Sequence, residues 1–203
     1  MFVTLEGIDR SGKTTQAALL ARALGPETVL LREPGGTAVG ERVRAILKDP
    51  ALELSSGAEL LLFNAARSQL ASEVVAPALE EGRHVVCDRY IDSTVAYQGV
   101  ARELGVEIVE QLNALVVGSC VPDVTVLLRV EVGTALDRGQ QRLAEGAEDG
   151  TDRFEAEGAE FQRRVADAYD DLATRHPDRI RVVDGEGSPE EVHSRVLEAV
   201  TSR

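Results

Sequence analysis

The segment that decides the fold is Gly7-Ile8-Asp9-Arg10-Ser11-Gly12-Lys13-Thr14, close to the start of the chain. It fits the pattern G-x-x-x-x-G-K-[ST], in which glycines let backbone N–H groups curl around a phosphate. The apolar run at residues 2–6 predicts a buried strand before it, and residues 11–24 repeat apolar side chains at helical spacing after it. A strand, a glycine-rich loop and a helix in this order predict a P-loop; the alternative is an ordinary glycine-rich turn.

Each position of this loop suggests a role toward a nucleoside triphosphate. Lys13 can bridge the β- and γ-phosphates, and Thr14 can ligate Mg²⁺. Lys13 is also one of only two lysines among 22 basic residues, the rest being arginine. We expect the remaining contacts to the cofactor ATP from Gly7, Ile8, Asp9, Arg10, Ser11, Gly12 and Thr15.

Strand-like and helix-like stretches alternate along the rest of the chain. We expect strands at residues 2–6, 28–31, 84–87, 123–130 and 179–183, and helices at 11–24, 39–47, 55–81, 93–118, 132–143, 154–175 and 189–200. Pro77 should kink or end the third helix, and Gly105 should interrupt the fourth. The alternation predicts an α/β, three-layer fold of the P-loop NTPase type, with a parallel five-stranded sheet and helices on both faces. We expect one domain over residues 1–203.

Chemistry-bearing residues follow three of the expected strands. Gly7, Glu33 and Asp88 each come directly after one, and the carboxyl ends of parallel strands form the ligand-binding edge of such sheets. Within Asp88-Arg89-Tyr90, the carboxylate can hold the Mg²⁺ shell and Arg89 can reach a transferring phosphate. The alternative is a surface ion pair at a strand end.

Composition limits the partners. The 203 residues carry 22 basic and 35 acidic side chains, a formal net charge of −13, which repels nucleic acid and anionic membranes. No apolar run approaches the ~18 residues of a membrane span, and the first ten residues do not resemble a signal peptide. We therefore expect a cytoplasmic protein without nucleic-acid or membrane partners, in which Cys87 and Cys120 are reduced core thiols.

The remaining patterns narrow the function class. The NKxD motif with which GTPases read their base is absent, and the chain is short for a motor ATPase. Residues 139–152 form an acidic, glycine-punctuated stretch, expected to be a mobile lid, and Arg138 and Arg142 lie four apart on the helix leading into it. These features favour a nucleotide kinase.

Six segments carry a family resemblance that spans the chain. They are Leu5 to Gln16, Arg32-Glu33-Pro34-Gly35-Gly36-Thr37, Leu61-Leu62-Phe63 with Arg67, Asp88-Arg89-Tyr90, Ala96-Tyr97-Gln98-Gly99 and Asp152-Arg153-Phe154-Glu155. Together they resemble the thymidylate kinase (dTMP kinase) family. The resemblance implies Mg²⁺-assisted transfer of the ATP γ-phosphoryl group to dTMP, giving dTDP for dTTP biosynthesis, in a homodimer.

The resemblance also assigns the base and sugar contacts. Phe63 and Arg67 share one helix face. The residues alone favour Phe63 as part of the core, whereas the resemblance implies that Phe63 stacks on thymine and that Arg67 donates to its carbonyl. The amide of Gln98 matches the N–H and C=O edge of the base. Tyr97 would crowd the sugar 2′ position and disfavour ribose.

The phosphate contacts follow in the same way. Arg44 would hold the acceptor phosphate, Asp9 and Glu33 would lie near the acceptor sugar and phosphate, and Pro34, Arg89 and Ser93 complete the substrate site. We expect Arg138 to contact the cofactor, and Lys13, Arg10, Asp9, Arg89 and Arg142 to form the catalytic set. In this family the catalytic arginine comes from the P-loop or from the lid, which leaves Arg10 and Arg142 as alternatives.

Two other functions compete with this interpretation. One is another mononucleotide or deoxynucleoside kinase; a nucleoside acceptor would require Asp9 or Glu33 as a base for the 5′-hydroxyl. The other is a non-catalytic P-loop switch that recruits a partner. The presence of Lys13, Thr14 and Asp88 argues against the switch.

Overall fold

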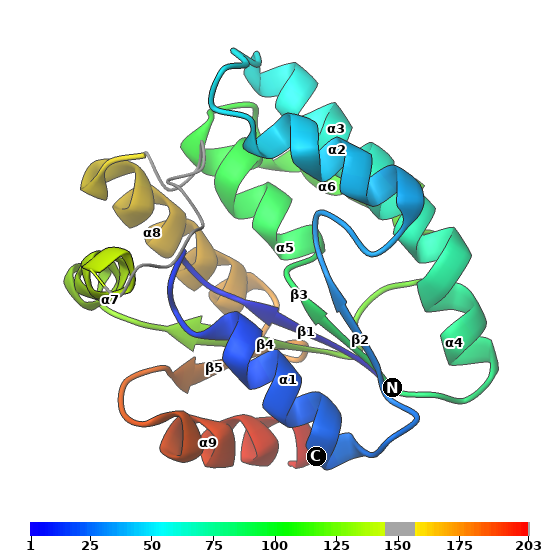
Figure 1. Cartoon of the computed structure of the whole chain (residues 1–203). Helices are drawn as coiled ribbons and strands as arrows, with labels where there is room; N and C mark the ends of the chain where they lie inside the picture. The colour runs from blue at the N-terminus through cyan, green and yellow to red at the C-terminus, as the bar shows by residue number, and fades with distance from the viewer. Residues whose placement is uncertain (145–156, 203) are drawn as a thin grey trace.

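Five short strands form one parallel sheet in the computed structural model of the chain, which describes residues 1–144 and 157–202 without the side chains of 142–144 (Figure 1). The strands are β1 (Phe2–Glu6), β2 (Val29–Arg32), β3 (Val85–Asp88), β4 (Val124–Arg129) and β5 (Ile180–Asp184). Their order is β2-β3-β1-β4-β5, and every neighbouring pair is parallel. The predicted α/β fold is confirmed, and the P-loop leaves the carboxyl end of the central strand.

Helices cover both faces of the sheet. In the described ranges they are α1 (Lys13–Leu24), α2 (Ala38–Lys48), α3 (Ser56–Leu70), α4 (Ala76–Glu80), α5 (Ile91–Thr94), α6 (Val106–Val117), α7 (Val132–Ala144), α8 (Ala159–Arg175) and α9 (Pro189–Thr201), with π-helical turns η1 (Ala71–Val75) and η2 (Val95–Ala101). α1 and α9 pack together on one face, while η2, α6 and α8 pack against the other (Figure 1). Within residues 1–144 and 157–202, no helix has the length and apolarity needed to cross a membrane.

The central strand separates its side chains between these faces. Val3 and Leu5 join the apolar cluster under α1 and α9, whereas Phe2 packs with α3, η1 and α4. Because strand side chains alternate, Thr4 and Glu6 point the same way as Phe2. Both are fully buried, and the Thr4 hydroxyl is satisfied by the Thr125 hydroxyl at 2.9 Å. Glu6 is thus a carboxylate that the fold places inside the protein.

The expected long helix at residues 55–81 is three consecutive helical segments. The chain stays helical through Pro77, which lies in the first turn of α4, and the wider π-helical turn η1 comes immediately before it. Proline lacks an N–H and its ring displaces the carbonyl four residues back, and such widened turns interrupt the regular α-helical bonding. The predicted disturbance at Pro77 therefore takes the form of a π-turn.

Two further helix boundaries can be compared with the prediction from the sequence. The interruption near Gly105 is confirmed: η2 ends at Ala101, and Gly105 has a φ of 94° directly before α6. The predicted helix at residues 154–175 includes residues 157 and 158, which are not helical. α8 begins at Ala159, after an extended Gly158. Residues 139–144 of the expected lid complete α7, and the rest of it lies outside the described residues.

Gly7 is a position where the fold requires glycine, and replacing it gives a direct test. Its φ is 140°, and a Cβ there would lie 2.6 Å from the Leu128 carbonyl oxygen of the neighbouring strand. We expect Gly7→Ala to lower the free energy of unfolding by about 2–4 kcal/mol, measured by urea denaturation.

Gly57 supplies the matched control, since it is exposed in the first turn of α3 and a Cβ there would meet nothing within 4 Å. Gly57→Ala should be neutral or stabilising by up to about 1 kcal/mol. Equal stability of the two variants would contradict the packing argument.

Candidate active site

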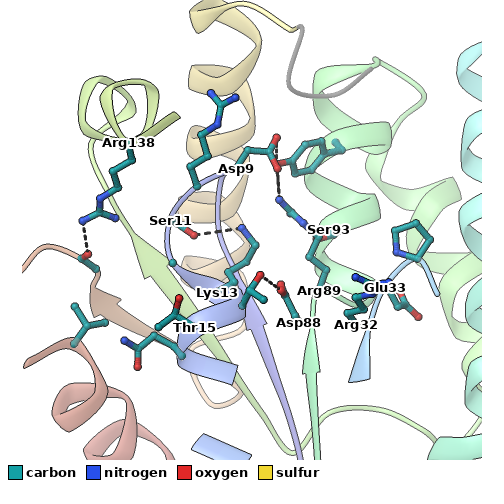
Figure 2. A pocket seen from close by; sticks show the side chains of 18 of the residues that line it. Asp9, Ser11, Lys13, Thr15, Arg32, Glu33, Asp88, Arg89, Ser93 and Arg138 are labelled. Carbon is teal, nitrogen blue, oxygen red and sulfur yellow. Dashed lines mark hydrogen bonds and ion pairs between the residues drawn. The ribbon is translucent and has the colours of Figure 1, made fainter. Parts of the chain in front are cut away.

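A cavity of about 710 Å³ opens at the carboxyl edge of the sheet, between the P-loop and the α2–α3 side of the molecule (Figure 2). Most of the predicted site residues line it: Asp9, Arg10, Ser11, Gly12, Lys13, Thr14, Thr15, Glu33, Pro34, Arg44, Phe63, Asp88, Arg89, Ser93, Tyr97, Gln98 and Arg138. Gly7, Ile8 and Arg67 do not line it, and the Arg142 side chain lies outside the described part of the chain. Segments far apart in sequence therefore meet at one cavity.

The P-loop is a tightly wound turn braced by its own lysine. Arg10 and Gly12 have φ values of 64° and 96°, which coil the backbone. Lys13 Nζ donates to the Ile8 carbonyl at 2.7 Å and to Ser11 Oγ at 3.3 Å. Burial, followed by the nearby Arg89, lowers the pKa of Lys13 to about 8. The ammonium therefore stays mainly charged at pH 7 while lying in a site largely withdrawn from water.

Thr14 and Asp88 meet below this loop. The Thr14 hydroxyl, at the start of α1, donates to Asp88 Oδ2 at the end of β3 over 2.5 Å (Figure 2). Hydroxyl and carboxylate oxygens are the donors that Mg²⁺ prefers, and Mg²⁺ usually takes its other ligands from substrate phosphates and water. Across residues 1–144 and 157–202, no cluster of three or more acidic, His or Cys side chains forms a closed metal cage. The pair fits a Mg²⁺ shared with phosphate.

Arg89 is the centre of a second polar cluster. Its guanidinium donates to the Gly7 carbonyl, Ser93 Oγ and Tyr97 Oη, each at 3.2 Å, and it pairs closely with Asp9. Burial alone would raise the pKa of Asp9, but Arg89 and Lys13 hold it below its usual value. Asp9 is therefore a carboxylate, and it fixes a cation at the middle of the cavity.

Glu6 is a residue of this cluster that sequence reasoning missed. Its carboxylate accepts from the backbone N–H groups of Tyr90 at 2.8 Å and Ser93 at 3.2 Å, from Ser93 Oγ at 2.6 Å, and from Tyr169 Oη at 2.8 Å. Burial and, next, the charge of Asp92 raise the pKa of Glu6 to about 7. A lone acidic residue at the end of an apolar strand was the available signal.

Arg67 lies behind the cavity wall rather than in it. It is 1% exposed, and its five N–H groups are all engaged, by Glu33, Thr94, Asn113 and the Tyr90 carbonyl. Its ion pair with Glu33 is 2.7 Å long. Because these bonds use every donor of the guanidinium, a direct bond to the base would require one of them to be given up. The role of Arg67 in binding thymine stays a prediction.

Aromatic and amide side chains from α3 and η2 also line the cavity. Phe63 packs against the apolar cluster of Val43, Leu47 and Ala66, and it also lines the cavity. Its surroundings therefore fit both a core residue and a residue that stacks on a base. Gln98 is 1% exposed, and its Nε2 donates to Glu59 Oε1 at 2.9 Å. Glu59 is a second residue that the sequence analysis did not single out.

Arginines of the surrounding helices frame the opening. Arg44 donates to the Pro34 carbonyl at 2.9 Å, and Arg138 donates to the Gly185 carbonyl at 3.2 Å, next to the P-loop. The Arg10 guanidinium lies directly against Gly139 of α7, where a Cβ would collide with it. Sequence reasoning also missed the cavity-lining Arg32, Lys48 and Gln141.

A parallel sheet with a P-loop on its central strand, oxygen donors at the next strand and a cationic cavity defines a nucleotide-binding protein of the P-loop phosphotransferase class. A sequence model described as thymidylate kinase matches residues 5–196. The chain belongs to the thymidylate kinase family, as its resemblance predicted.

Individual relatives agree over the full length. The thymidylate kinase of Syntrophotalea carbinolica is 46% identical over 199 residues, covering 96% of this chain and 92% of that protein. That of Deinococcus radiodurans is 42% identical over 206 residues, covering 100% of this chain and 97% of the relative. The crystal structure of thymidylate kinase from Ehrlichia chaffeensis superposes with a TM-score of 0.78 at 36% identity, covering 99% and 98% of the two chains.

Glu6 gives the site a measurable pH dependence. Its pKa in the folded protein is raised, so it stabilises the fold fully below the unfolded value of about 4.5, and this stability is lost as pH rises to about 7. The change amounts to about 3 kcal/mol. Glu6→Gln should lack this loss of stability with rising pH. We therefore expect the free energy of unfolding of the parent, measured by urea denaturation, to fall relative to that of Glu6→Gln between pH 5 and pH 8.

Glu107, exposed on α6, provides the control. A Glu107→Gln variant should keep the pH profile of the parent. A constant difference between parent and Glu6→Gln across this range would show that Glu6 is ionised throughout.

Proposed function

We propose that the chain transfers the γ-phosphoryl group of ATP to the phosphate of dTMP, giving ADP and dTDP for dTTP biosynthesis. The observation that carries the proposal is one cavity that is lined by the P-loop, by Arg89, and by the Phe63 ring and the Gln98 amide. An oxygen of the dTMP phosphate would attack the γ-phosphorus of ATP. The bond between the γ-phosphorus and the oxygen that bridges to the β-phosphate would break, and ADP would leave. The acceptor phosphate is already largely anionic at neutral pH, with a pKa near ~6 by analogy with phosphoserine, so that no general base is needed.

The donor end would hold ATP through the P-loop. The loop backbone from Gly7 to Thr15 would surround the phosphates, and Lys13 would contact the β- and γ-phosphates. Arg138, beside the Gly185 carbonyl, is placed to contact the nucleotide. Thr14 and Asp88 would hold Mg²⁺, which when bound neutralises charge on the transferring phosphate.

The acceptor end would hold dTMP through residues from four segments. Arg44 and Arg89 would grip its phosphate, and Asp9, Glu33, Pro34 and Ser93 would surround the phosphate and sugar. Phe63 and Gln98 would face the base, and Tyr97 would exclude the ribose 2′-hydroxyl. Arg67 would donate to the base carbonyl only by giving up one of its bonds to protein groups. The packing of Phe63 and the orientation of Gln98 support this arrangement.

The charge that develops on the phosphoryl group needs an arginine, and this role is typically worth about 10³–10⁵ in rate. Arg10 lines the cavity from the rigid P-loop, which supports it as the larger contributor. Arg142 remains the alternative that the family resemblance supplies.

We also propose a homodimer that works in the cytoplasm as one domain over residues 1–203. Large apolar side chains on neighbouring helices support the dimer: Leu61 of α3 is 60% exposed, and Ile108 and Leu115 of α6 are 59% and 79% exposed. The two cysteines are buried free thiols, which suits a reducing compartment.

A nucleoside acceptor is less well supported than a nucleotide. It would need a carboxylate base, but Asp9 is engaged by Arg89, by Tyr97 at 3.1 Å and by Gln162 at 3.0 Å. A coupled ADP-release assay over deoxynucleosides, dTMP, dUMP, dCMP, dGMP and dAMP separates the alternatives. Preference for dTMP supports the proposal, while a preferred nucleoside, or no turnover at all, would refute it.

Lys13 is the first residue to test. We expect Lys13→Met to lower kcat by at least ~10²-fold with the fold retained, because it removes the charge at the β/γ bridge while keeping the length of the stem. Steady-state kinetics and thermal unfolding measure the two effects. The control is Arg22→Met at the exposed far end of α1, which should turn over like the parent. Near-normal turnover of Lys13→Met would contradict the proposal that the P-loop binds the phosphates of ATP.

Gln98 tests the acceptor end separately. We expect Gln98→Ala to raise KM for dTMP by about 10-fold or more with little change in KM for ATP, because dTMP is the one substrate that loses a hydrogen-bond partner. Initial rates at varied dTMP and at varied ATP measure both constants. Equal losses for the two substrates would remove Gln98 from the base pocket.

A further inference from the structure

The amide of Gln98 is held in one orientation by Glu59. Both side chains are 1% exposed, and Gln98 Nε2 donates to Glu59 Oε1 at 2.9 Å. A carboxylate can only accept hydrogen bonds, so the half of the amide that faces it must be the NH₂ group. The hydrogen-bond partner itself therefore assigns the two ends of the amide.

Glu59 is in turn held by a cation. Arg102 Nε donates to the same Oε1 at 3.3 Å, and Arg102 Nη2 pairs with Glu157 at 2.6 Å. The Arg102 guanidinium also lies 4.7 Å from the centre of the Phe161 ring. A guanidinium has only donors, so nothing in this chain of contacts lets the Glu59 carboxylate or the Gln98 amide reverse its role.

This arrangement leaves one acceptor for a ligand. Gln98 lines the cavity, and its Oε1 has no hydrogen bond to any residue that the structure describes. A pyrimidine with an N3–H group, thymine or uracil, can donate to that oxygen. Cytosine presents a lone pair at N3, and two acceptors would then face each other.

We propose that Glu59 is a specificity-determining positioning residue, which locks the Gln98 amide with its carbonyl oxygen toward the base and so selects bases that carry N3–H. The proposal rests on the placement of the base at Gln98 in the proposed function. Glu59 acts through Gln98 and touches no substrate.

Glu59→Met tests it, because a side chain of similar length without an acceptor at position 59 frees the Gln98 amide to reverse. We expect the ratio of kcat/KM for dTMP over dCMP to fall at least about tenfold. The dTMP over dUMP ratio should stay constant, since both bases present the same N3–H edge. KM for ATP should also stay constant. Glu103→Gln, which alters an exposed carboxylate paired with Arg164, is the matched control and should keep all three values.

The conservative variant Glu59→Gln supplies a second measurement. Its amide oxygen can still accept from both Arg102 Nε and Gln98 Nε2, so the Gln98 amide keeps its orientation. We expect Glu59→Gln to keep the preference for dTMP over dCMP that Glu59→Met loses. Where Glu59→Met fails to fold, Glu59→Gln combined with Arg102→Met decides, because the amide at position 59 can then turn its NH₂ group toward Gln98: a lost preference supports the proposal and a retained one overturns it.

The failure of this inference is distinguishable from failure of the proposed function. A folded Glu59→Met variant with unchanged dTMP over dCMP selectivity overturns the inference, even when Gln98→Ala selectively weakens the binding of dTMP. If Gln98→Ala raises KM for dTMP and for ATP alike, the base does not bind at Gln98. That result would contradict the placement of the base in the proposed function, on which the inference rests.

Discussion

The Glu6 carboxylate, fully buried at the end of the central strand, accepts hydrogen bonds from two other segments of the chain. One is the turn after β3, through the N–H groups of Tyr90 and Ser93, and the other is α8, through Tyr169. Four donors compensate much of the cost of burying this group. Because Ser93 Oγ also accepts from Arg89, the same carboxylate orients the cation at the centre of the cavity. The strand that carries the P-loop is thereby tied to the segment that carries Arg89.

Local charge resolves the conflict between an acidic protein and anionic substrates. The chain has a formal net charge of −13, yet Arg89 and the largely buried Lys13 line one cavity together. Asp9 neutralises part of that charge and holds Arg89 in place at the same time. Charges that are largely buried and held in place by protein groups act on a phosphate more strongly than exposed ones, and they need no reorganisation during transfer. The remaining acidic residues can therefore serve solubility without weakening phosphate binding.

The sequence predicted what local patterns determine. The P-loop, the five parallel strands and the break at Gly105 follow from glycine positions and apolar periodicity, and the structure confirms them. It could not predict the partners of buried polar residues, because these depend on which strands become neighbours. Arg67 was read from its helix face as a base donor, while the fold occupies all its donors with protein groups. Glu6 and Glu59 were missed for the same reason, since neither spacing nor residue type shows that a carboxylate will be buried.

The occupied guanidinium of Arg67 has a consequence for base recognition. A cation that faced the C2 carbonyl, which thymine and cytosine share, would not distinguish the two bases. By engaging Arg67 with Glu33 and Asn113, the fold withdraws that cation from the cavity surface. The neutral amide of Gln98 then remains at the base end, and a neutral amide distinguishes bases only if its two ends cannot exchange. Burial of one charged residue thus makes the orientation of the next polar residue decisive for selectivity.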